Sequence, residues 1–560
     1  MFVVRPCSVV EDRTPDLITL RFSLASGSSG AIRKMISSRL SLPVPHGVAL
    51  QPRPAIAFKS AWVLPLLALW LLLTLGLRPL LVPDEGRYVE VARAMFNGDW
   101  LVPTLNGLPF FHKPPLFYWI DMAAMQIFGV HEFAGRMGSA VGAWIMGAAL
   151  WFAVRRSLGE RVAGGALALL ATTPFFFIGA QYANHDMLVA GLITAAILAF
   201  ARAVDEPPRV DLRWVAGAWA LCGLALLSKG LIGVVLPVLV IGPWLLTQRR
   251  WRQVFGLMHP VGIASFVAVA APWCVAMQSR YPGFFDYFVI EQHFRRYVQT
   301  DFNNVRGFWF FIVVLPALTL PWSAWILRGV RQAVERRDPL DTLSLWWLAV
   351  VVGFFSFPSS KLVGYVLPAL APWCLLLARA LFENTPQRPV DAARRWTFAA
   401  ASVACVAIVV GSLWARIGSS RELGHALRDA RAGTDRVVMV GEYDYDLPFY
   451  AALTAPVLIV DNWNDPDIAR RDNWRKEMVD AARFDPALGK ELLRLPAEMD
   501  RLACGQSAAW FVVPSDRAAS VASLTGAERQ FFKAGGRELW RVKGRTCPPP
   551  ASAVLPTKAS

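Results

Sequence analysis

Six short groups of polar and charged residues lie between the long apolar runs of this chain. Charged side chains are costly at membrane depth, so they mark functional positions when they recur beside apolar runs. Acids, cations and aromatic rings together suit an anionic head group, most simply a phosphate. The six groups contain, in chain order, Asp84, Lys113, Asp186, Lys229, Arg296 and Lys361.

The first group places two adjacent carboxylates, Asp84 and Glu85, just after the first apolar run, with Arg87 close behind. As a functional group, Asp84 would face a polar substrate and take its proton or orient it, and Glu85 would bind the same substrate. Arg87 would be positioned by this acid or would grip an anion. The structural alternative is helix capping, with Asp84 as the N-cap and Glu85 in the first turn.

The second group joins His112 and Lys113 to a pair of prolines, Pro114 and Pro115. A residue before proline avoids the helical region, so Lys113 is held in an extended backbone. There it could contact a phosphate as a compact point charge. The alternative is a lysine that reaches toward lipid headgroups. His112 beside it is either a structural histidine or a metal ligand.

The other groups offer candidates of the same chemical kinds. Asp186 opens an apolar run, where it is either an N-cap or a site residue. For the remaining candidates the alternatives are again contact with headgroups or a solvated loop face. These remaining candidates are Lys229, His293, Arg296, Lys361 and Tyr365.

The composition is that of a membrane protein. Hydrophobic residues make up 55% of the chain and charged residues 18%, against about 45–50% and about 25% in soluble proteins. The net charge of +16 does not predict a nucleic-acid partner, because many basic residues lie in short loops between apolar runs, as topology signals do. No phosphate-binding glycine motif is found, so no nucleotide is expected.

About eleven runs are long enough to cross a bilayer. With residue 60 inside, every loop assigned to the cytoplasmic side is basic, as the positive-inside rule requires. This register places the N-terminus in the cytoplasm and the C-terminal region outside. The runs lie near 61–77, 133–153, 162–180, 186–203, 213–228, 230–248, 259–277, 308–327, 344–358, 362–381 and 396–414.

Three segments follow from this pattern. Residues 1–56 are predicted to be a disordered basic tail, with Met35 as an alternative start, and residues 57–415 a transmembrane domain. Residues 416–560 combine short apolar runs of strand character with helix-like stretches, which predicts a small α/β domain. The strand-like runs are Val437–Val440, Pro456–Val460 and Ala509–Val513, and the helix-like stretches include Asp467–Ala482 and Gly489–Leu502.

Two finer features are also predicted. The first outer loop contains amphipathic stretches at Glu85–Phe96 and Leu116–Phe128, which we expect to lie flat at the interface. In the C-terminal domain, Cys504 and Cys547 could pair if the domain is exported.

The motifs resemble one known family. The strings at Asp84–Tyr88, Asp99–Pro103, Phe111–Leu116, Ser228–Gly230 and Lys361–Pro368 are similar to those of the bacterial aminoarabinose lipid A transferases. These are GT-C glycosyltransferases related to protein O-mannosyltransferases. The resemblance implies an all-α polytopic bundle of about 11–13 transmembrane helices, with interfacial helices and a periplasmic α/β domain, in the bacterial inner membrane.

The resemblance also implies residue roles and partners. Asp84 matches the family's essential aspartate, and Lys113, Arg296 and Tyr365 match the residues that hold a carrier phosphate. Asp186 and Lys229 fall on further functional positions. His112 stands where the family has a glutamate that helps bind a divalent metal ion.

The implied reaction moves a sugar from a polyprenyl phosphate to lipid A, with 4-amino-4-deoxy-L-arabinose as the expected sugar. A protein or another glycan as acceptor is the first alternative. The second is a transporter of lipid-linked sugar without chemistry. A transporter would more naturally show repeats and mid-membrane charges, whereas the charges here lie at one face.

Overall fold

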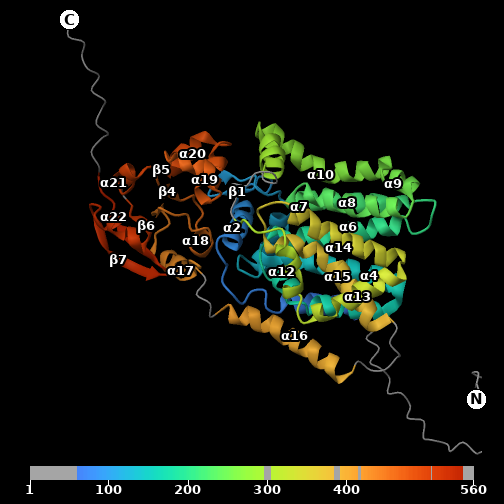
Figure 1. The fold of residues 1–560 in the computed structure, drawn as a ribbon. Coiled ribbons are helices and arrows are strands. Elements are labelled where there is room, and N and C mark those ends of the chain that lie inside the picture. The colour runs from blue at the N-terminus through green and yellow to red at the C-terminus, as the bar shows by residue number, and fades with distance from the viewer. Residues whose placement is uncertain (1–59, 296–303, 384–390, 414–417, 506, 547–560) are drawn as a thin grey trace, which may run out of the picture. The chain divides into compact units, whose positions relative to one another are not determined.

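The structure is a computed structural model that describes residues 60–295, 304–383, 391–413, 418–505 and 507–546. The described residues belong to one compact unit, Phe58–Ser560. The predicted tail and Met35 lie outside the described residues, and so do Arg296 and Cys547. Figure 1 shows a layered group of helices and, in orange and red, a region that contains a sheet.

Each predicted apolar run coincides with a helix or a pair of helices. Six described helices are long and apolar enough to cross a membrane, or seven if the bent pair Phe310–Leu318 and Trp322–Arg336 forms one span. The prediction of a polytopic helical membrane protein is therefore confirmed. The helices are α1 (Val63–Leu72), α4 (Met137–Ala171), α5 (Pro174–Ala180), α6 (His185–Ala203), α7 (Leu212–Lys229), α8 (Ile232–Thr247), α9 (Trp251–Leu257), α10 (Pro260–Arg280), α12 (Phe310–Leu318), α13 (Ile326–Arg336), α14 (Pro339–Ser356), α15 (Leu370–Ala378) and α16 (Ala392–Gly411).

One inner loop is shorter than predicted. The sequence assigned residues 154–161 to a loop, but helix α4 continues through this stretch and breaks only at Gly159. Two apolar runs are thus joined almost without a linker. The basic residues of this stretch remain at the break, where Arg155 pairs with Glu160 at 2.7 Å.

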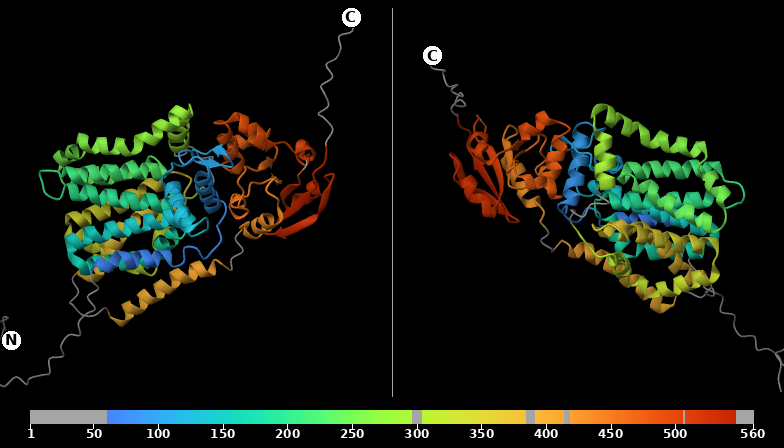
Figure 2. Two further views of the ribbon diagram at one scale, coloured as in Figure 1. Left: turned by 180° about the vertical axis from the view of Figure 1, so that it is seen from behind. Right: turned by 45° about the horizontal axis from the view of Figure 1, so that its top comes forward.

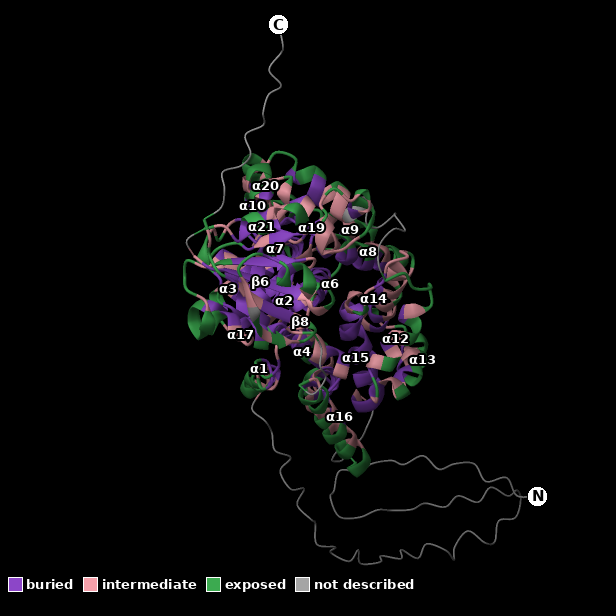
Figure 3. Cartoon of the chain, turned by 90° about the vertical axis from the view of Figure 1, so that its left-hand side faces the viewer, coloured by how far each residue is buried: buried purple, intermediate pink, exposed green. Residues whose placement is uncertain are grey.

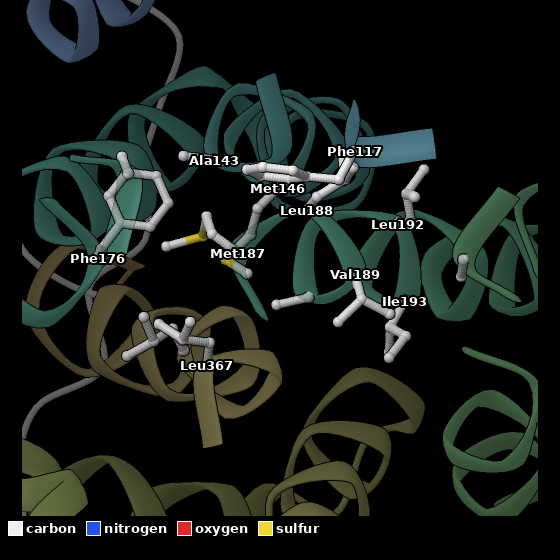
Figure 4. Packing of buried hydrophobic residues seen from close by; sticks show 14 of the residues in the cluster. Phe117, Ala143, Met146, Phe176, Met187, Leu188, Val189, Leu192, Ile193 and Leu367 are labelled. Carbon is white, nitrogen blue, oxygen red and sulfur yellow. The ribbon is translucent and has the colours of Figure 1, made fainter. Parts of the chain in front are cut away.

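Burial separates central helices from peripheral ones. The apolar window of α6 is 83% buried and that of Val363–Glu383 is 94% buried, whereas that of α16 is only 17% buried. Figure 3 shows the same contrast, with α16 largely green and pink beside purple helices. Exposed apolar faces on a spanning helix are the faces that lipid covers. Helix α6 therefore lies inside the bundle, where Met187 and Leu188 pack among other apolar side chains (Figure 4).

The loop that is predicted to be the first outer one folds into two helices and a hairpin, in agreement with the two predicted amphipathic stretches. They are α2 (Asp84–Asn97) and α3 (Leu116–Phe128), separated by the short strands β1 (Thr104–Leu105) and β2 (Leu108–Pro109). Helix α2 does not lie on an open interface, because its polar Glu85, Glu90 and Arg93 are buried together with its apolar residues. It packs against both α3 and a C-terminal helix, α18 (Leu447–Tyr450).

The C-terminal region is an α/β unit, as predicted. Its six-stranded sheet has the order β5-β4-β3-β6-β8-β7, in which the first four strands are parallel and the last two pairings are antiparallel. The strands are β3 (Arg436–Val440), β4 (Leu458–Val460), β5 (Leu493–Arg494), β6 (Ala509–Pro514), β7 (Ala527–Ala534) and β8 (Arg537–Val542). The helices are α17 (Arg421–Ala430), α18 (Leu447–Tyr450), α19 (Trp474–Ala482), α20 (Pro486–Leu492), α21 (Met499–Leu502) and α22 (Ala518–Ala522).

Three of the six strands were predicted from apolar runs, namely β3, β4 and β6. The parallel pairing joins Val438 to Leu458 on one side and to Phe511 on the other, and the sheet builds a small core of its own. The predicted helical stretch Gly489–Leu502 is interrupted by β5. Cys504 is disulfide-bonded. Figure 2 shows the sheet from two further directions.

Candidate active site

Three predicted groups meet at the ends of central helices. Asp186 lies in the first turn of α6, and Lys229 is the last residue of α7. The Lys229 ammonium forms an ion pair with the Asp186 carboxylate and lies 4.7 Å from the centre of the Tyr365 ring. A lysine held between a carboxylate and an aromatic face is fixed in position, because both contacts attract the positive charge.

The close approach of these groups depends on Gly364. A Cβ atom at this position would lie 2.2 Å from Asp186 Oδ2, so any larger residue would push the carboxylate away. The capping alternative for Asp186 is wrong, because Asn184 is the N-cap and its side chain accepts a hydrogen bond from the Asp186 N–H at 3.1 Å. The Asp186 carboxylate is thus available for Lys229.

The two adjacent acids of the first loop have different surroundings. Asp84 is the first residue of α2 after the N-cap Pro83, and its side chain is 31% exposed. The Tyr182 hydroxyl donates to Asp84 Oδ2 over 3.5 Å, and Arg87 lies 3.6 Å from the other oxygen. Burial, helped by the charge of Asp84, raises the pKa of Tyr182, so its phenol stays a proton donor. Asp84 is therefore the acid of this pair that can meet a substrate.

Glu85 is fully buried and its oxygens are saturated with donors. Arg78 and Arg136 both form ion pairs with it, and the backbone N–H groups of Leu81 and Ala183 donate to it at 2.9 and 2.8 Å. Burial alone would raise the pKa of Glu85, but Arg136 and Arg78 outweigh it and lower the pKa to about 2. The expectation that Glu85 binds substrate is at odds with this geometry, because no lone pair faces an open space.

The two constellations are connected through the short link before α6. Tyr182 contacts Asp84, and the same link continues to His185, whose ring lies 4.7 Å from that of Tyr88 on α2. The rings of Tyr88, Phe117 and Tyr118 enclose His185. Lys113 lies shortly before α3 and is partly buried.

His112 has aromatic neighbours. Its ring stacks on Phe110 with centres 4.5 Å apart and lies 5.8 Å from the ring of Tyr287. Within the described ranges, no group of three or more histidine, cysteine or acidic side chains has the arrangement of a metal site. The described residues around His112 therefore do not fit the expected divalent metal.

Lys361 has a structural environment. Its ammonium donates to the carbonyl oxygens of Pro358 and, at 3.0 Å, Arg306, and its backbone N–H donates to Asn304 at 3.1 Å. These bonds tie the segment around Asn304 to the segment around Pro358, which is at odds with a substrate-binding lysine. His293 lies in the π-helix η3 (Asp286–Arg295), but its side chain is outside the described part of the structure.

The sequence missed residues that come from distant parts of the chain. Arg136, which binds Glu85, is completely buried. Glu477 of α19 lies 2.8 Å from Arg87. Burial alone would lower the pKa of Arg87, but Glu477 and Tyr445 outweigh it and raise the pKa. No spacing along the sequence links these partners. The one signal is that Arg136 is a charge within the predicted apolar run 133–153, where charged residues usually pair with one another.

Comparison with known proteins identifies similar sequences. A family model described as dolichyl-phosphate-mannose-protein mannosyltransferase matches residues 112–277. The undecaprenyl phosphate-alpha-4-amino-4-deoxy-L-arabinose arabinosyl transferase of Erwinia tasmaniensis is 33% identical over 56% of this chain and 57% of its own length. The protein of the same name from Pseudomonas aeruginosa is 33% identical over 58% and 60%. The matched part spans less than two thirds of either relative.

Comparison with solved structures identifies the fold. ArnT from Cupriavidus metallidurans bound to undecaprenyl phosphate superimposes with a TM-score of 0.74, at 21% identity, over 86% of this chain and 97% of that one. Its apo state gives a TM-score of 0.72. This chain has the ArnT fold. The fold predicted from the motifs is confirmed, and the resemblance to the aminoarabinose lipid A transferases is supported by both sequence and structure.

Proposed function

We propose that this protein is a membrane glycosyltransferase that moves a sugar from a polyprenyl phosphate carrier to lipid A or a related lipid acceptor. The proposed sugar is 4-amino-4-deoxy-L-arabinose, in line with the names of the similar proteins. The proposed place is the periplasmic face of the bacterial inner membrane, with the N-terminus in the cytoplasm. The basic loops support this orientation, which reporter fusions at both ends would test.

The observation that carries the proposal is that the Lys229 ammonium contacts both the Asp186 carboxylate and the Tyr365 ring. These residues come from α6, α7 and the 3-10 helix η5 (Val363–Ala369). Tyr182, which donates to Asp84, lies in the short link before α6. Charged side chains clustered at the ends of membrane helices suit a lipid-linked phosphate, because its head group is polar and its tail lies in the bilayer.

The chemistry follows from these groups. The bond between the sugar's anomeric carbon and the carrier phosphate breaks, and a bond from that carbon to an acceptor oxygen forms. Lys113, Arg296 and Tyr365 are proposed to stabilise the negative charge on the departing phosphate, which is the role that most lowers the barrier. Asp84 orients the acceptor or takes its proton. Attack opposite the phosphate inverts the anomeric centre.

This mechanism needs little base catalysis when the acceptor is itself a phosphate, because its oxygen is already ionised. Asp84 is then a positioning group. The energy comes from the phosphate ester, so no nucleotide takes part. No step is assigned to a metal, since the described residues do not provide its ligands.

A direct assay tests the function. Purified protein is incubated with undecaprenyl-phosphate-linked aminoarabinose and lipid A, and mass spectrometry measures the mass added to lipid A. The expected result is one added aminoarabinose that disappears with Asp84→Asn. No transfer from any polyprenyl-linked sugar by a correctly folded protein would overturn the proposal.

A protein acceptor is the second candidate. The match of residues 112–277 to a protein mannosyltransferase model favours it. Mass spectrometry of cells with and without the gene distinguishes the two, because lipid A loses a sugar in one case and membrane or periplasmic proteins lose it in the other.

A further inference from the structure

We propose that Glu477 is a positioning residue of the active site, contributed by the C-terminal region, and that it holds Arg87 in the orientation that Asp84 needs. This inference rests on the proposed function, and it assigns the C-terminal α/β region a part in the reaction. A chain of contacts runs from Tyr445 through Glu477 and Arg87 to Asp84.

Both carboxylate oxygens of Glu477 have a defined partner. Oε1 lies 2.8 Å from Arg87 Nη1, and Oε2 accepts a hydrogen bond from the Tyr445 hydroxyl at 2.5 Å. The Glu477 side chain is only 7% exposed, so solvent does not screen these bonds strongly. Two fixed partners leave the carboxylate a single orientation, and it imposes this orientation on Arg87.

Two aromatic rings hold the Arg87 guanidinium in addition to its ion pair with Glu477. It lies 4.8 Å from the centre of the Tyr445 ring and 5.6 Å from that of Tyr88. Its second amino group, Nη2, lies 3.6 Å from Asp84 Oδ1. The planar fork of an arginine presents its donors at fixed angles. Holding Nη1 on Glu477 therefore aims Nη2 at Asp84.

Helix α2 approaches the C-terminal region closely at this point. A Cβ atom at Gly86 would lie 3.0 Å from both the Cβ and the backbone nitrogen of Asp446, so a larger residue would require the two segments to move slightly apart. Buried ion pairs are weak as a source of stability, because an apolar contact of equal size does as well. We therefore assign the buried Arg87–Glu477 pair a role in orienting Arg87 rather than in holding α2 and the C-terminal region together.

Helix α19, which carries Glu477, also contacts the segment that leads to Arg296. Lys476 Nζ and Arg483 Nη1 each lie 3.7 Å from the Glu291 carboxylate in η3. Lys476 and Glu477 are adjacent on α19, and they reach two different segments that carry proposed site residues. Helix α19 thus connects the Asp84 segment with the segment before Arg296.

The test compares Glu477→Gln with Glu491→Gln in the full-length protein. Gln keeps the size of Glu477 but removes the charge that orients Arg87, whereas Glu491 is an exposed residue on the neighbouring helix α20. We expect kcat to fall about ten- to hundredfold in Glu477→Gln, as small misplacements of catalytic groups do. The KM for the lipid-linked donor stays near the wild-type value. The thermal midpoint falls, because a buried ion pair loses one partner, so kcat is measured at a temperature where the variant is folded. Glu491→Gln matches wild type throughout.

A double-mutant comparison separates positioning from general damage. If Glu477 acts through Arg87, Glu477→Gln causes no further loss in an Arg87→Ala background. Tyr445→Phe, which removes one donor and keeps the ring, gives a smaller fall in kcat of the same kind and serves if Glu477→Gln does not fold. A wild-type kcat in the folded Glu477→Gln protein, or fully additive losses with Arg87→Ala, would overturn the inference.

Hydrogen–deuterium exchange across Asp84–Asn97 gives a readout that needs no substrate. We expect faster exchange at the start of α2 in Glu477→Gln than in Glu491→Gln, because the clamp on Arg87 is weakened. If the wild-type protein transfers no sugar, the proposed function fails on that result alone. Unchanged exchange in Glu477→Gln would reject the positioning role whether or not the protein transfers sugar.

Discussion

Replacement of Glu85 by glutamine is expected to destabilise the protein strongly. The carboxylate is fully buried and forms ion pairs with both Arg78 and Arg136. Glutamine has nearly the same shape, but it lacks the charge and one acceptor. Two buried guanidinium groups would then lose their counter-charge, which is the costly way to break a buried ion pair.

The size of the effect follows from the pKa. The pKa of Glu85 falls from an ordinary 4.5 to about 2, and each unit corresponds to about 1.4 kcal/mol, so the charged form gains about 3 kcal/mol from folding. Loss of one partner from a buried pair costs about 3–5 kcal/mol. Both routes predict a free energy of unfolding lower by about 3 kcal/mol.

Thermal unfolding in detergent measures this loss, with Glu491→Gln as the matched exposed control. Because the folded pKa of Glu85 lies below its unfolded value, the stabilisation is fully present above pH 4.5 and is lost as pH falls toward about 2. The difference between wild type and Glu85→Gln should therefore shrink over that range. An equal thermal midpoint in wild type and Glu85→Gln at pH 7 would refute the reasoning.

Four further predictions concern other parts of the molecule. Asp84→Asn should abolish sugar transfer in the lipid A assay while leaving the thermal midpoint unchanged, and retained transfer would reject the role of Asp84. Lys229→Met should lower transfer more than Tyr365→Phe does, because Asp186 then lacks its buried cation; equal activities would contradict this. Treatment with EDTA should leave transfer unchanged, and a loss restored by Zn²⁺ would show that a metal is required. Burial raises the pKa of Asp446 to about 6, so the stability of the wild type relative to Asp446→Asn should fall as pH rises from about 4 to about 6. Parallel pH–stability curves for the two proteins would contradict this.

Much of the fold could be predicted from the sequence, because a bilayer permits few structures. A spanning segment must satisfy its backbone internally, so a long apolar run is a helix. The C-terminal sheet was harder, since strands β7 and β8 contain many charged residues and carry no continuous apolar run. Residues such as Lys533 and Glu538 pair across these strands, and such pairing is not visible in either strand alone.

The candidate site was predicted in part. The motifs identified Asp186, Lys229 and Tyr365, which the structure brings together. Arg136 and Glu477 were missed, because each acts on a residue from a distant segment. Local spacing can place residues on one face of a helix, but it does not tell which distant segment covers that face.

Asp84 and Glu85 show most clearly where sequence reasoning stops. Successive residues of a helix point about 100° apart, so two neighbouring acids cannot share one environment once the helix is packed. One meets the Tyr182 hydroxyl near solvent, and the other is enclosed by two arginines. Loss of activity alone would make both positions look catalytic. Activity and stability measured together separate them, because Asp84→Asn should remove only transfer whereas Glu85→Gln should lower the stability of the fold that supports it.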